Sequence, residues 1–189
     1  MRTGRRGAAA LRAFLCGLAL ATSLPAAAQD DAAALERKVK AAFLYKFADY
    51  VDWPDGTFAR PGSPITVGVA GEDQIAAELA QVASARSVDG RPLQVRKLRE
   101  GDSLAGLHVL FVGRAESARL LPLARATQAQ PLLLVTESDN ALSQGSIINF
   151  VMTGGRVRFE IALDNAERRG LKLSSRLLTV AQNVRTGQP

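Results

Sequence analysis

Few residues of this chain have side chains that commonly carry out catalysis. His108 is the single histidine among 189 residues, and Cys16 is the single cysteine. A serine–histidine–aspartate triad could be built on His108, but the G-x-S-x-G sequence that presents a nucleophilic serine in many hydrolases is absent. One histidine cannot supply the usual ligand sets of zinc or redox metals. Because His108 lies in an apolar run, we expect its side chain to lie in the core or at a sheet edge. We expect no metal and no cofactor.

Acidic pairs and glycine-rich turns offer no clearer chemistry. Asp30 and Asp31 lie in a terminal segment, and Glu72 and Asp73 lie at the expected start of a helix, where helix capping accounts for them. Residues 68–71 (GVAG) lack the G-x-G-x-x-G spacing of dinucleotide loops, and no G-x-x-x-x-G-K phosphate loop is present. The chain is therefore expected to act through its surface or a small-ligand pocket, not as an enzyme. A hydrolase that uses His108 is the disfavoured alternative.

Residues 1–28 have the pattern of a cleavable signal peptide. The positive n-region contains four arginines, at positions 2, 5, 6 and 12, and no acid, and an apolar run follows at residues 13–21 (AFLCGLALA). This run is far shorter than the roughly 20 residues that span a bilayer. Leu15 precedes Cys16 where a lipoprotein needs a small residue. Ala26 and Ala28 fit the A-x-A rule, so we expect cleavage before Gln29 and export of the remaining chain.

Removal of this segment changes the charge balance. The whole chain has 24 basic and 18 acidic residues, for a net charge of +6. The four arginines of the predicted signal leave 20 basic and 18 acidic residues, or +2. A strong basic footprint is the usual mark of a nucleic-acid partner, and none remains. We therefore expect no nucleic-acid binding. With Cys16 removed, the mature chain contains no thiol and no disulfide.

The mature chain alternates between helical and strand patterns. Apolar side chains at helical spacing predict a helix over residues 31–52, with Leu35, Val39, Phe43, Phe47 and Tyr50 on its buried face. Further helices are predicted at residues 71–85 and 116–127. A last helix follows Gly170, with Ser174 or Ser175 as N-cap and Leu177, Leu178, Ala181 and Val184 on its buried side. Short apolar runs predict strands at residues 65–70, 93–98, 108–112, 132–136, 147–153 and 156–163.

The last two strands form the clearest local structure. Gly154 and Gly155 join them, and a two-residue glycine turn is typical of a tight hairpin. This turn predicts three apolar pairs on one face: Met152 with Val157, Phe150 with Phe159, and Ile148 with Ile161. The other face pairs Val151 with Arg158 and Asn149 with Glu160. Together these patterns predict a single α/β domain at residues 29–189, with a mixed sheet of about six strands, helices on both faces and a C-terminal hairpin plus helix.

Several segments of the chain, in order and behind a signal peptide, resemble the YfiR family. The segments are residues 40–47 (KAAFLYKF), 51–54 (VDWP), 108–112 (HVLFV), 145–150 (GSIINF), 157–161 (VRFEI) and 170–178 (GLKLSSRLL), and the resemblance extends over essentially the whole mature chain. The resemblance implies a periplasmic α/β regulator, often dimeric, that inhibits an inner-membrane diguanylate cyclase by binding its periplasmic sensor domain. An outer-membrane lipoprotein can draw such regulators away. Lower cyclic-di-GMP and reduced biofilm formation would follow.

Two features depart from this family pattern. The best-known members use disulfides, which the mature chain lacks, so redox control is not carried over. Ala162 follows Ile161 where the family often has asparagine. Three polar residues of the hairpin are candidates for partner binding: Asn149, Arg158 and Glu160. The simpler interpretation is that they form a solvated strand face or an internal salt bridge. The alternative function is a periplasmic ligand-binding module that serves a histidine kinase or a TonB-type receptor.

Overall fold

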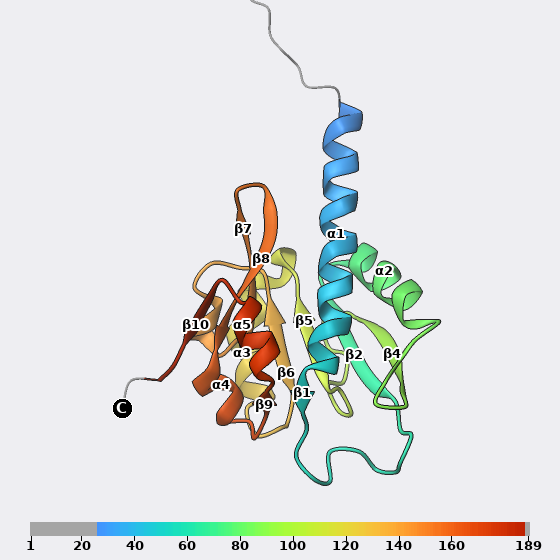
Figure 1. The fold of residues 1–189 in the computed structure, drawn as a ribbon, viewed down its shortest axis with the longest axis vertical. Helices are drawn as coiled ribbons and strands as arrows, with labels where there is room; N and C mark the ends of the chain where they lie inside the picture. Colours follow the sequence, from blue (N-terminus) through green and yellow to red (C-terminus); the bar gives the residue numbers. More distant parts are fainter. Residues whose placement is uncertain (1–25, 188–189) are drawn as a thin grey trace, which may run out of the picture.

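The computed structural model describes residues 26–187. Cys16 and most of the predicted signal peptide therefore lie outside the described residues. The first helix, α1 (Ala26–Asp49), already includes Gln29, so the predicted cleavage point falls within the first turn of this helix. Figure 1 shows α1 running past the body of the molecule, with its N-terminal end projecting beyond the strands.

The strands form a mixed sheet with the spatial order β10-β8-β7-β6-β5-β2-β4-β3 (Figure 1). The five strands from β4 to β7 in this order are parallel, β8 runs antiparallel to β7, and β10 is parallel to β8. The strand bounds are β2 (Ile65–Ala70), β3 (Ser87–Val88), β4 (Arg91–Leu98), β5 (Val109–Val112), β6 (Leu133–Thr136), β7 (Ile148–Thr153), β8 (Arg156–Ala162) and β10 (Asn183–Arg185). A separate two-stranded pair joins β1 (Val51–Asp52) to β9 (Lys172–Leu173).

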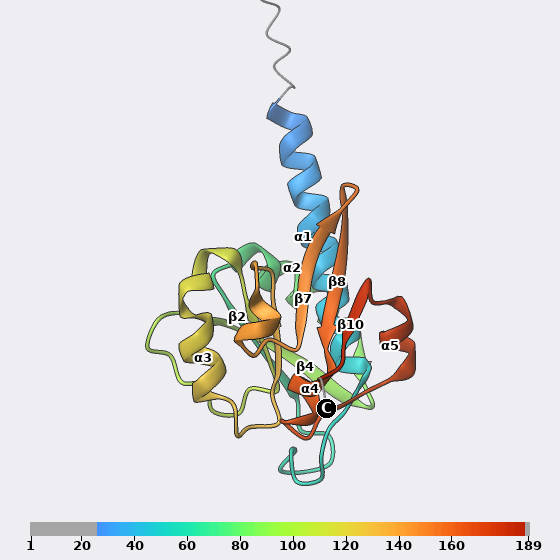
Figure 2. The same cartoon turned by 90° about the vertical axis from the view of Figure 1, so that its left-hand side faces the viewer.

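Helices cover both faces of this sheet, which is why its central strands are apolar on both sides. Val109 and Phe111 enter the core beneath α1 and α2 (Asp73–Ala83), whereas Leu110 and Val112 enter a second core beneath α3 (Leu120–Ala126). In Figure 2, α3 lies on one side of the strands and α5 (Ser175–Val180) on the other. The remaining helical segments are η1 (Arg114–Arg119), η2 (Ala141–Gln144) and α4 (Leu163–Glu167).

The predicted α/β class and all six predicted strands are confirmed. The described part of the sheet has eight strands because β3 and β10 add to its edges. These strands contain only two or three residues, too few to show a period in the sequence. The first helix ends at Asp49 and not at residue 52, because Val51 and Asp52 pair with β9.

Two further helix predictions need correction. The helix predicted at residues 116–127 is divided into the 3-10 segment η1 and the α-helix α3. Ser174 is confirmed as the N-cap of α5, since its hydroxyl oxygen accepts a hydrogen bond from the Leu177 amide at 3.3 Å. This helix stops at Val180, however, and Val184 lies in β10, where pairing with Ile161 of β8 replaces the helical face that we predicted.

The hairpin has the predicted register throughout, from Thr153 opposite Arg156 to Ile148 opposite Ile161. Gly154 and Gly155 have φ values of 56° and 71°, which a type I′ turn requires at both central positions. The predicted core face ends earlier than expected, because Met152 is 50% exposed. The hairpin tip extends past the neighbouring strand ends (Figure 1), so of the three predicted pairs only Phe150–Phe159 and Ile148–Ile161 have both residues in the core.

An aromatic cluster joins α1 to this hairpin. The ring of Phe47 lies 4.9 Å from that of Phe159, edge to face, and 5.6 Å from that of Phe150. Phe43, one turn earlier on α1, lies 5.3 Å from Phe159. Phe47 is fully buried, so this contact combines burial of a large apolar side chain with favourable aromatic geometry.

We therefore expect Phe47→Ala to lower the free energy of unfolding by about 3–5 kcal/mol, because the cavity removes core contacts between the helix and the sheet. Urea unfolding followed by circular dichroism measures this change. Val180→Ala is the control, since Val180 is 58% exposed and its truncation should change stability by less than about 0.5 kcal/mol. Equal effects of the two substitutions would contradict the proposed importance of the aromatic cluster.

Candidate functional site: the groove between the first helix and the hairpin

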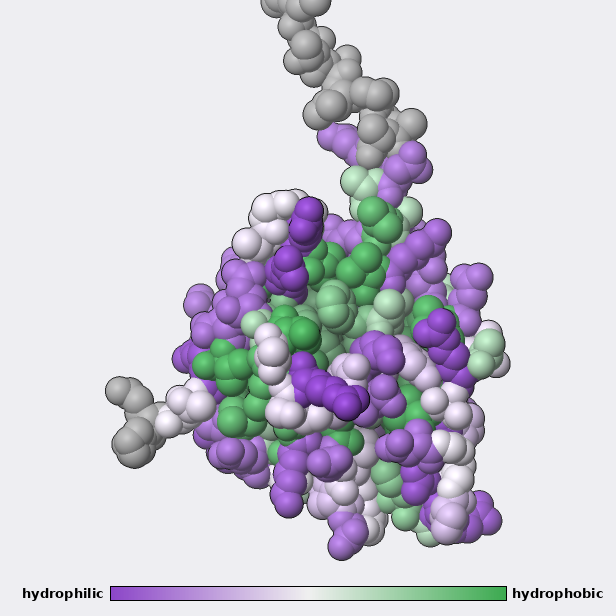
Figure 3. Space-filling view, in the orientation of Figure 1, coloured by the Kyte–Doolittle hydropathy of each residue, from purple (hydrophilic) through white to green (hydrophobic). Residues whose placement is uncertain are grey.

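An open apolar groove separates the N-terminal half of α1 from the tip of the β7–β8 hairpin. Its volume is about 790 Å³. Figure 3 shows hydrophobic surface gathered between these two elements. Leu35 on the helix is 63% exposed and Met152 on the hairpin is 50% exposed. The lining is mainly apolar and comes from both elements: Ala32, Ala33, Leu35, Val39 and Phe43 from α1, and Met152 and Val157 from the hairpin, with polar residues at the rim.

Five of these residues were predicted from the sequence to lie on buried faces: Leu35, Val39 and Phe43 of the helix, and Met152 and Val157 of the hairpin. Leu35 and Val39 continue the helical apolar stripe that buries Phe47, and Met152 continues the alternation that buries Phe150. Neither the helical stripe nor the strand alternation shows where the strands beneath α1 and beside the hairpin end. The groove is therefore the extension of two correctly predicted apolar faces beyond the ends of the sheet.

The three predicted partner-binding residues lie in different environments. Arg158 is exposed and lines the groove, and Glu160 is half-buried on β8. Asn149 is only 6% exposed. Its side-chain oxygen accepts hydrogen bonds from the Thr136 hydroxyl at 2.8 Å and from the Ser138 amide at 3.1 Å.

These positions test the two simpler interpretations of that strand face, a solvated surface and an internal salt bridge. Asn149 is not solvated, because β6 covers it and satisfies its oxygen. Among residues 26–187, neither Arg158 nor Glu160 belongs to an ion pair, so an internal salt bridge is not formed. A role in partner binding stays a prediction for all three residues, and Arg158 is the one with an exposed side chain at the groove.

A buried charged cluster fixes α1 over the carboxyl end of β6. The Lys40 ammonium group donates hydrogen bonds to Glu36 and, at 2.5 Å, to Glu137. The second oxygen of Glu137 accepts from the Arg114 amide at 2.9 Å. Lys40 is 7% exposed and Glu137 is 6% exposed. Burial by itself lowers the pKa of Lys40, but hydrogen bonds and attraction from Glu137 and Glu36 outweigh burial and raise the Lys40 pKa.

Glu72 lies beside this cluster at the carboxyl end of β2. Burial raises the pKa of Glu72, and repulsion from Glu137 raises it further. The sequence did not predict the cluster, because Lys40 and Glu137 are 97 positions apart and Glu137 lies in a segment predicted to be a turn. The cluster is connected to the groove, since Glu36 lines both the groove and the small charged pocket around Lys40.

At the open end of the parallel sheet, the turn where nucleotides usually bind is filled by a side chain. In the order β4-β2-β5-β6-β7, that point lies between β2 and β5. Gly71 follows β2 with φ +78°, and a Cβ atom there would lie 2.6 Å from Cγ of Glu116. The side chain of Glu116, whose carboxylate is paired with Arg119 at 2.8 Å, therefore occupies the space against this turn.

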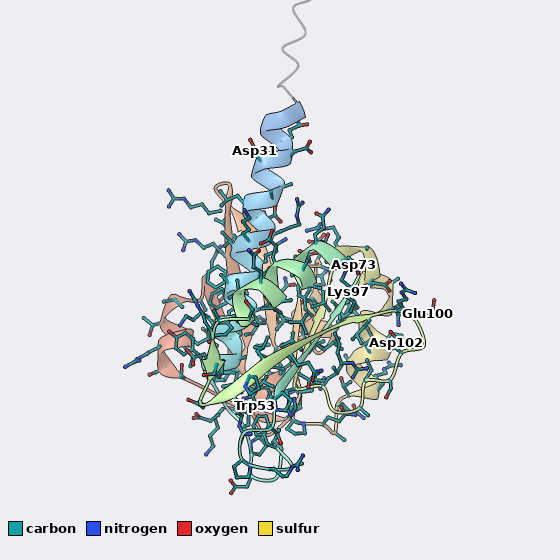
Figure 4. The ribbon with its side chains drawn as sticks, turned by 90° about the vertical axis from the view of Figure 1, so that its right-hand side faces the viewer. Asp31, Trp53, Asp73, Lys97, Glu100 and Asp102 are labelled. Atoms are coloured by element: carbon teal, nitrogen blue, oxygen red, sulfur yellow. The ribbon has the colours of Figure 1, made fainter. Side chains whose placement is uncertain are left out.

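His108 lies in an aromatic stack remote from the groove. Its ring stacks on Phe58 at 4.7 Å and meets Trp53 edge to face at 5.9 Å. Nδ1 accepts a hydrogen bond from the Thr66 amide at 3.0 Å. Burial lowers the pKa of His108, so the ring is neutral at physiological pH. Figure 4 shows Asp31 near the N-terminal end of α1 and Trp53 at the opposite end of the molecule. This environment agrees with a structural histidine.

The described residues carry neither a candidate metal centre nor a candidate membrane span. Within residues 26–187, no group of three or more His, Cys, Asp or Glu side chains is arranged to hold a metal ion. No helix in that part of the chain combines the length and apolar character needed to cross a membrane.

The fold and the groove define a mixed-sheet α/β protein whose most conspicuous surface is an apolar groove beside a helix. The chain belongs to the YfiR/HmsC-like family, whose model matches residues 37–182 of 189. This is a family of periplasmic regulatory proteins that act in cyclic-di-GMP signalling, and it is not a known enzyme family. A comparison with curated protein sequences gives no match.

The ion pair between Lys40 and Glu137 yields a stability prediction. Glu137→Gln should lower the free energy of unfolding by about 3–5 kcal/mol at neutral pH, because it leaves the buried ammonium group of Lys40 without its main counter-charge. The double substitution Lys40→Met/Glu137→Leu should lower the free energy of unfolding by less than Glu137→Gln alone, since it leaves no buried charge unpaired. Because the pKa of Lys40 is raised, the contribution of the pair is complete at neutral pH and is lost only as the pH rises through that raised pKa.

Chemical denaturation at neutral and strongly alkaline pH measures these differences. Asp49→Asn on the same helix is the matched control, because its exposed pair with Lys46 has a separation of 3.5 Å and should contribute less than about 1 kcal/mol. A double variant that is less stable than Glu137→Gln would show that packing at this site, and not the charge pair, determines the loss.

Proposed function

We propose that this protein inhibits an inner-membrane diguanylate cyclase by binding the cyclase's periplasmic sensor region. Inhibition lowers cyclic-di-GMP and biofilm formation. Membership of the YfiR/HmsC-like family supports a regulatory role in this signalling context. The observation that carries the proposal is the apolar groove, in which Leu35 and Met152 are 63% and 50% exposed and face each other across one continuous apolar lining.

The groove has the character of a protein-binding surface. Its apolar floor is formed by Phe43 and Val157, which are continuous with the core. Its hairpin rim carries Arg156 and Arg158. These features fit an amphipathic segment of the sensor region that places apolar side chains in the groove and acidic side chains against the two arginines. Arg158, Glu160 and Asn149 form the hairpin part of the proposed contact, with Asn149 holding β7 against β6 from within.

Inhibition follows if the groove binds the inactive cyclase more tightly than the active one. A bound protein shifts a conformational equilibrium only by the difference between its affinities for the two states. An outer-membrane lipoprotein that competes for this protein would release the cyclase by lowering the free concentration of the inhibitor. Homodimer formation is part of the proposal too, and sedimentation of the purified protein measures it.

Deletion of the gene should raise cellular cyclic-di-GMP and surface attachment, because the deletion removes an inhibitor that binds the inactive state. Mass spectrometry of nucleotide extracts, under conditions in which the gene is expressed, measures the change. The control is expression of the wild-type gene from a plasmid, which should restore the original level. Unchanged cyclic-di-GMP would overturn the regulatory proposal and favour the periplasmic ligand-binding module.

Met152→Glu should weaken binding to the cyclase's periplasmic region at least about tenfold, because it places an unpaired charge in an apolar contact. The matched control is Leu121→Glu, since Leu121 is 39% exposed and lies on α3, across the sheet from the groove. Calorimetric titration with the purified sensor domain measures the affinities, and circular dichroism checks the fold. Equal affinities of the two variants would place the contact outside the groove.

A further inference from the structure

A second crevice lies on the other face of the molecule, between the C-terminal end of α3 and the segment that includes α4. Its volume is about 350 Å³, within the range of small-ligand sites. None of its lining residues belongs to the groove. Its lining is rich in cationic and amide side chains and contains no acid: Arg125, Arg168, Arg169, Gln128, Gln144 and Asn165.

Arg169 is the buried cation of this crevice and is only 8% exposed. Its guanidinium group donates to the Thr127 carbonyl oxygen at 2.5 Å and to the Ala124 carbonyl oxygen at 3.2 Å. Within residues 26–187 no carboxylate forms an ion pair with it. Burial, followed by repulsion from Arg168, lowers the pKa of Arg169. The positive charge is thus desolvated, and neutral carbonyl groups are its partners in the described chain.

Capping of α3 accounts for part of this arrangement. A basic side chain that binds the last carbonyl groups of a helix is favourable. Capping does not account for the two further arginines at the same crevice, Arg125 and Arg168, the second of which repels the buried cation. A guanidinium group also has five N–H donors, and the hydrogen bonds to Thr127 and Ala124 use only part of them.

The second arginine is held in position by its neighbours. Arg168 donates to the side-chain oxygen of Asn165 and pairs with Asp164 at 2.9 Å. Asn165 is 5% exposed, and its amide nitrogen donates to the carbonyl oxygens of Leu142 at 2.8 Å and Ser146 at 2.6 Å. Because both polar atoms of the Asn165 side chain form hydrogen bonds, the orientation of that side chain is fixed, and it holds the guanidinium group of Arg168 in turn. The crevice is therefore preorganised before a ligand arrives.

We propose that this crevice binds a small oxyanion, either a phosphate-bearing or a carboxylate-bearing solute. Three arginines line it, Arg125 from α3 and Arg168 and Arg169 from the turn after α4, and guanidinium groups bind planar or tetrahedral oxyanions with charge-assisted, often bidentate, hydrogen bonds. A bound anion supplies the counter-charge that Arg169 lacks and removes the repulsion between Arg168 and Arg169. The site lies beneath α3, across the sheet from α1, so the proposal is independent of the proposed cyclase contact.

Calorimetric titration of the full mature protein with inorganic phosphate and with citrate, at constant ionic strength, tests this proposal. We expect saturable binding of at least one of them with a dissociation constant below about 1 mM. Arg125→Gln/Arg168→Gln should weaken that binding at least about tenfold, because it removes two charged donors from the crevice. Both side chains are exposed, so the fold should be kept.

The matched control is Arg99→Gln/Arg176→Gln, which removes the same charge from exposed positions outside the crevice. Its affinity should equal that of the wild type. In the wild-type protein, phosphate or citrate should also shift the backbone amide resonances of Gly145 and Asn165, a readout that needs no variant. The proposal is overturned if neither anion saturates below about 10 mM, or if both double variants lose affinity equally.

Discussion

The length of α1 relative to the sheet is the constraint from which the main surface of this protein arises. Counted from the predicted mature start at Gln29, α1 still extends roughly 30 Å, whereas the six-residue strands β2 and β7 extend roughly 20 Å. The C-terminal half of α1 can therefore bury Phe47 against the sheet while the N-terminal half has no strand beneath it. Since the apolar stripe continues into that half, Leu35 is left exposed opposite the equally extended hairpin tip. The groove is the space between these two overhangs.

The charged cluster complements the aromatic contact. Apolar packing between Phe47 and Phe159 provides stability but is tolerant of rotation, because burial has little directional preference. The hydrogen-bonded pair of Lys40 and Glu137 is directional and fixes the rotation of α1 about its axis. Glu36, which shares the Lys40 ammonium group, also lines the groove. The same interaction that orients the helix therefore orients one wall of the proposed partner site.

The sequence predicted those features that depend on neighbours in the chain. The hairpin register follows from Gly154, Gly155 and the two-residue period of their flanking strands, and all its predicted pairs are present. Features that depend on distant segments were not predictable. The sequence left Asn149 open between a solvated strand face and a partner contact, whereas Thr136 and Ser138 of a neighbouring segment bury it and satisfy its side-chain oxygen. Met152 was predicted to be a core residue because the alternation of apolar and polar side chains along β7 continues past the point where the adjacent strand ends. The arginine crevice likewise requires the C-terminal end of α3 to contact Arg169 in the turn after α4, which no local pattern encodes.

A buried polar network connects the crevice side of the sheet to the hairpin. Asn165 donates to the Ser146 carbonyl oxygen, the hydroxyl groups of Ser146 and Thr136 lie 2.8 Å apart, and Thr136 donates to Asn149 of β7. Each of these four residues is at least nine-tenths buried, so loosening any of them exposes an unsatisfied polar group to a dry interior. The network therefore holds the crevice and the hairpin in one fixed relation. An anion in the crevice would alter partner binding at the groove only to the extent that its affinities for the free and the partner-bound protein differ, and the reverse effect would be equal in free energy.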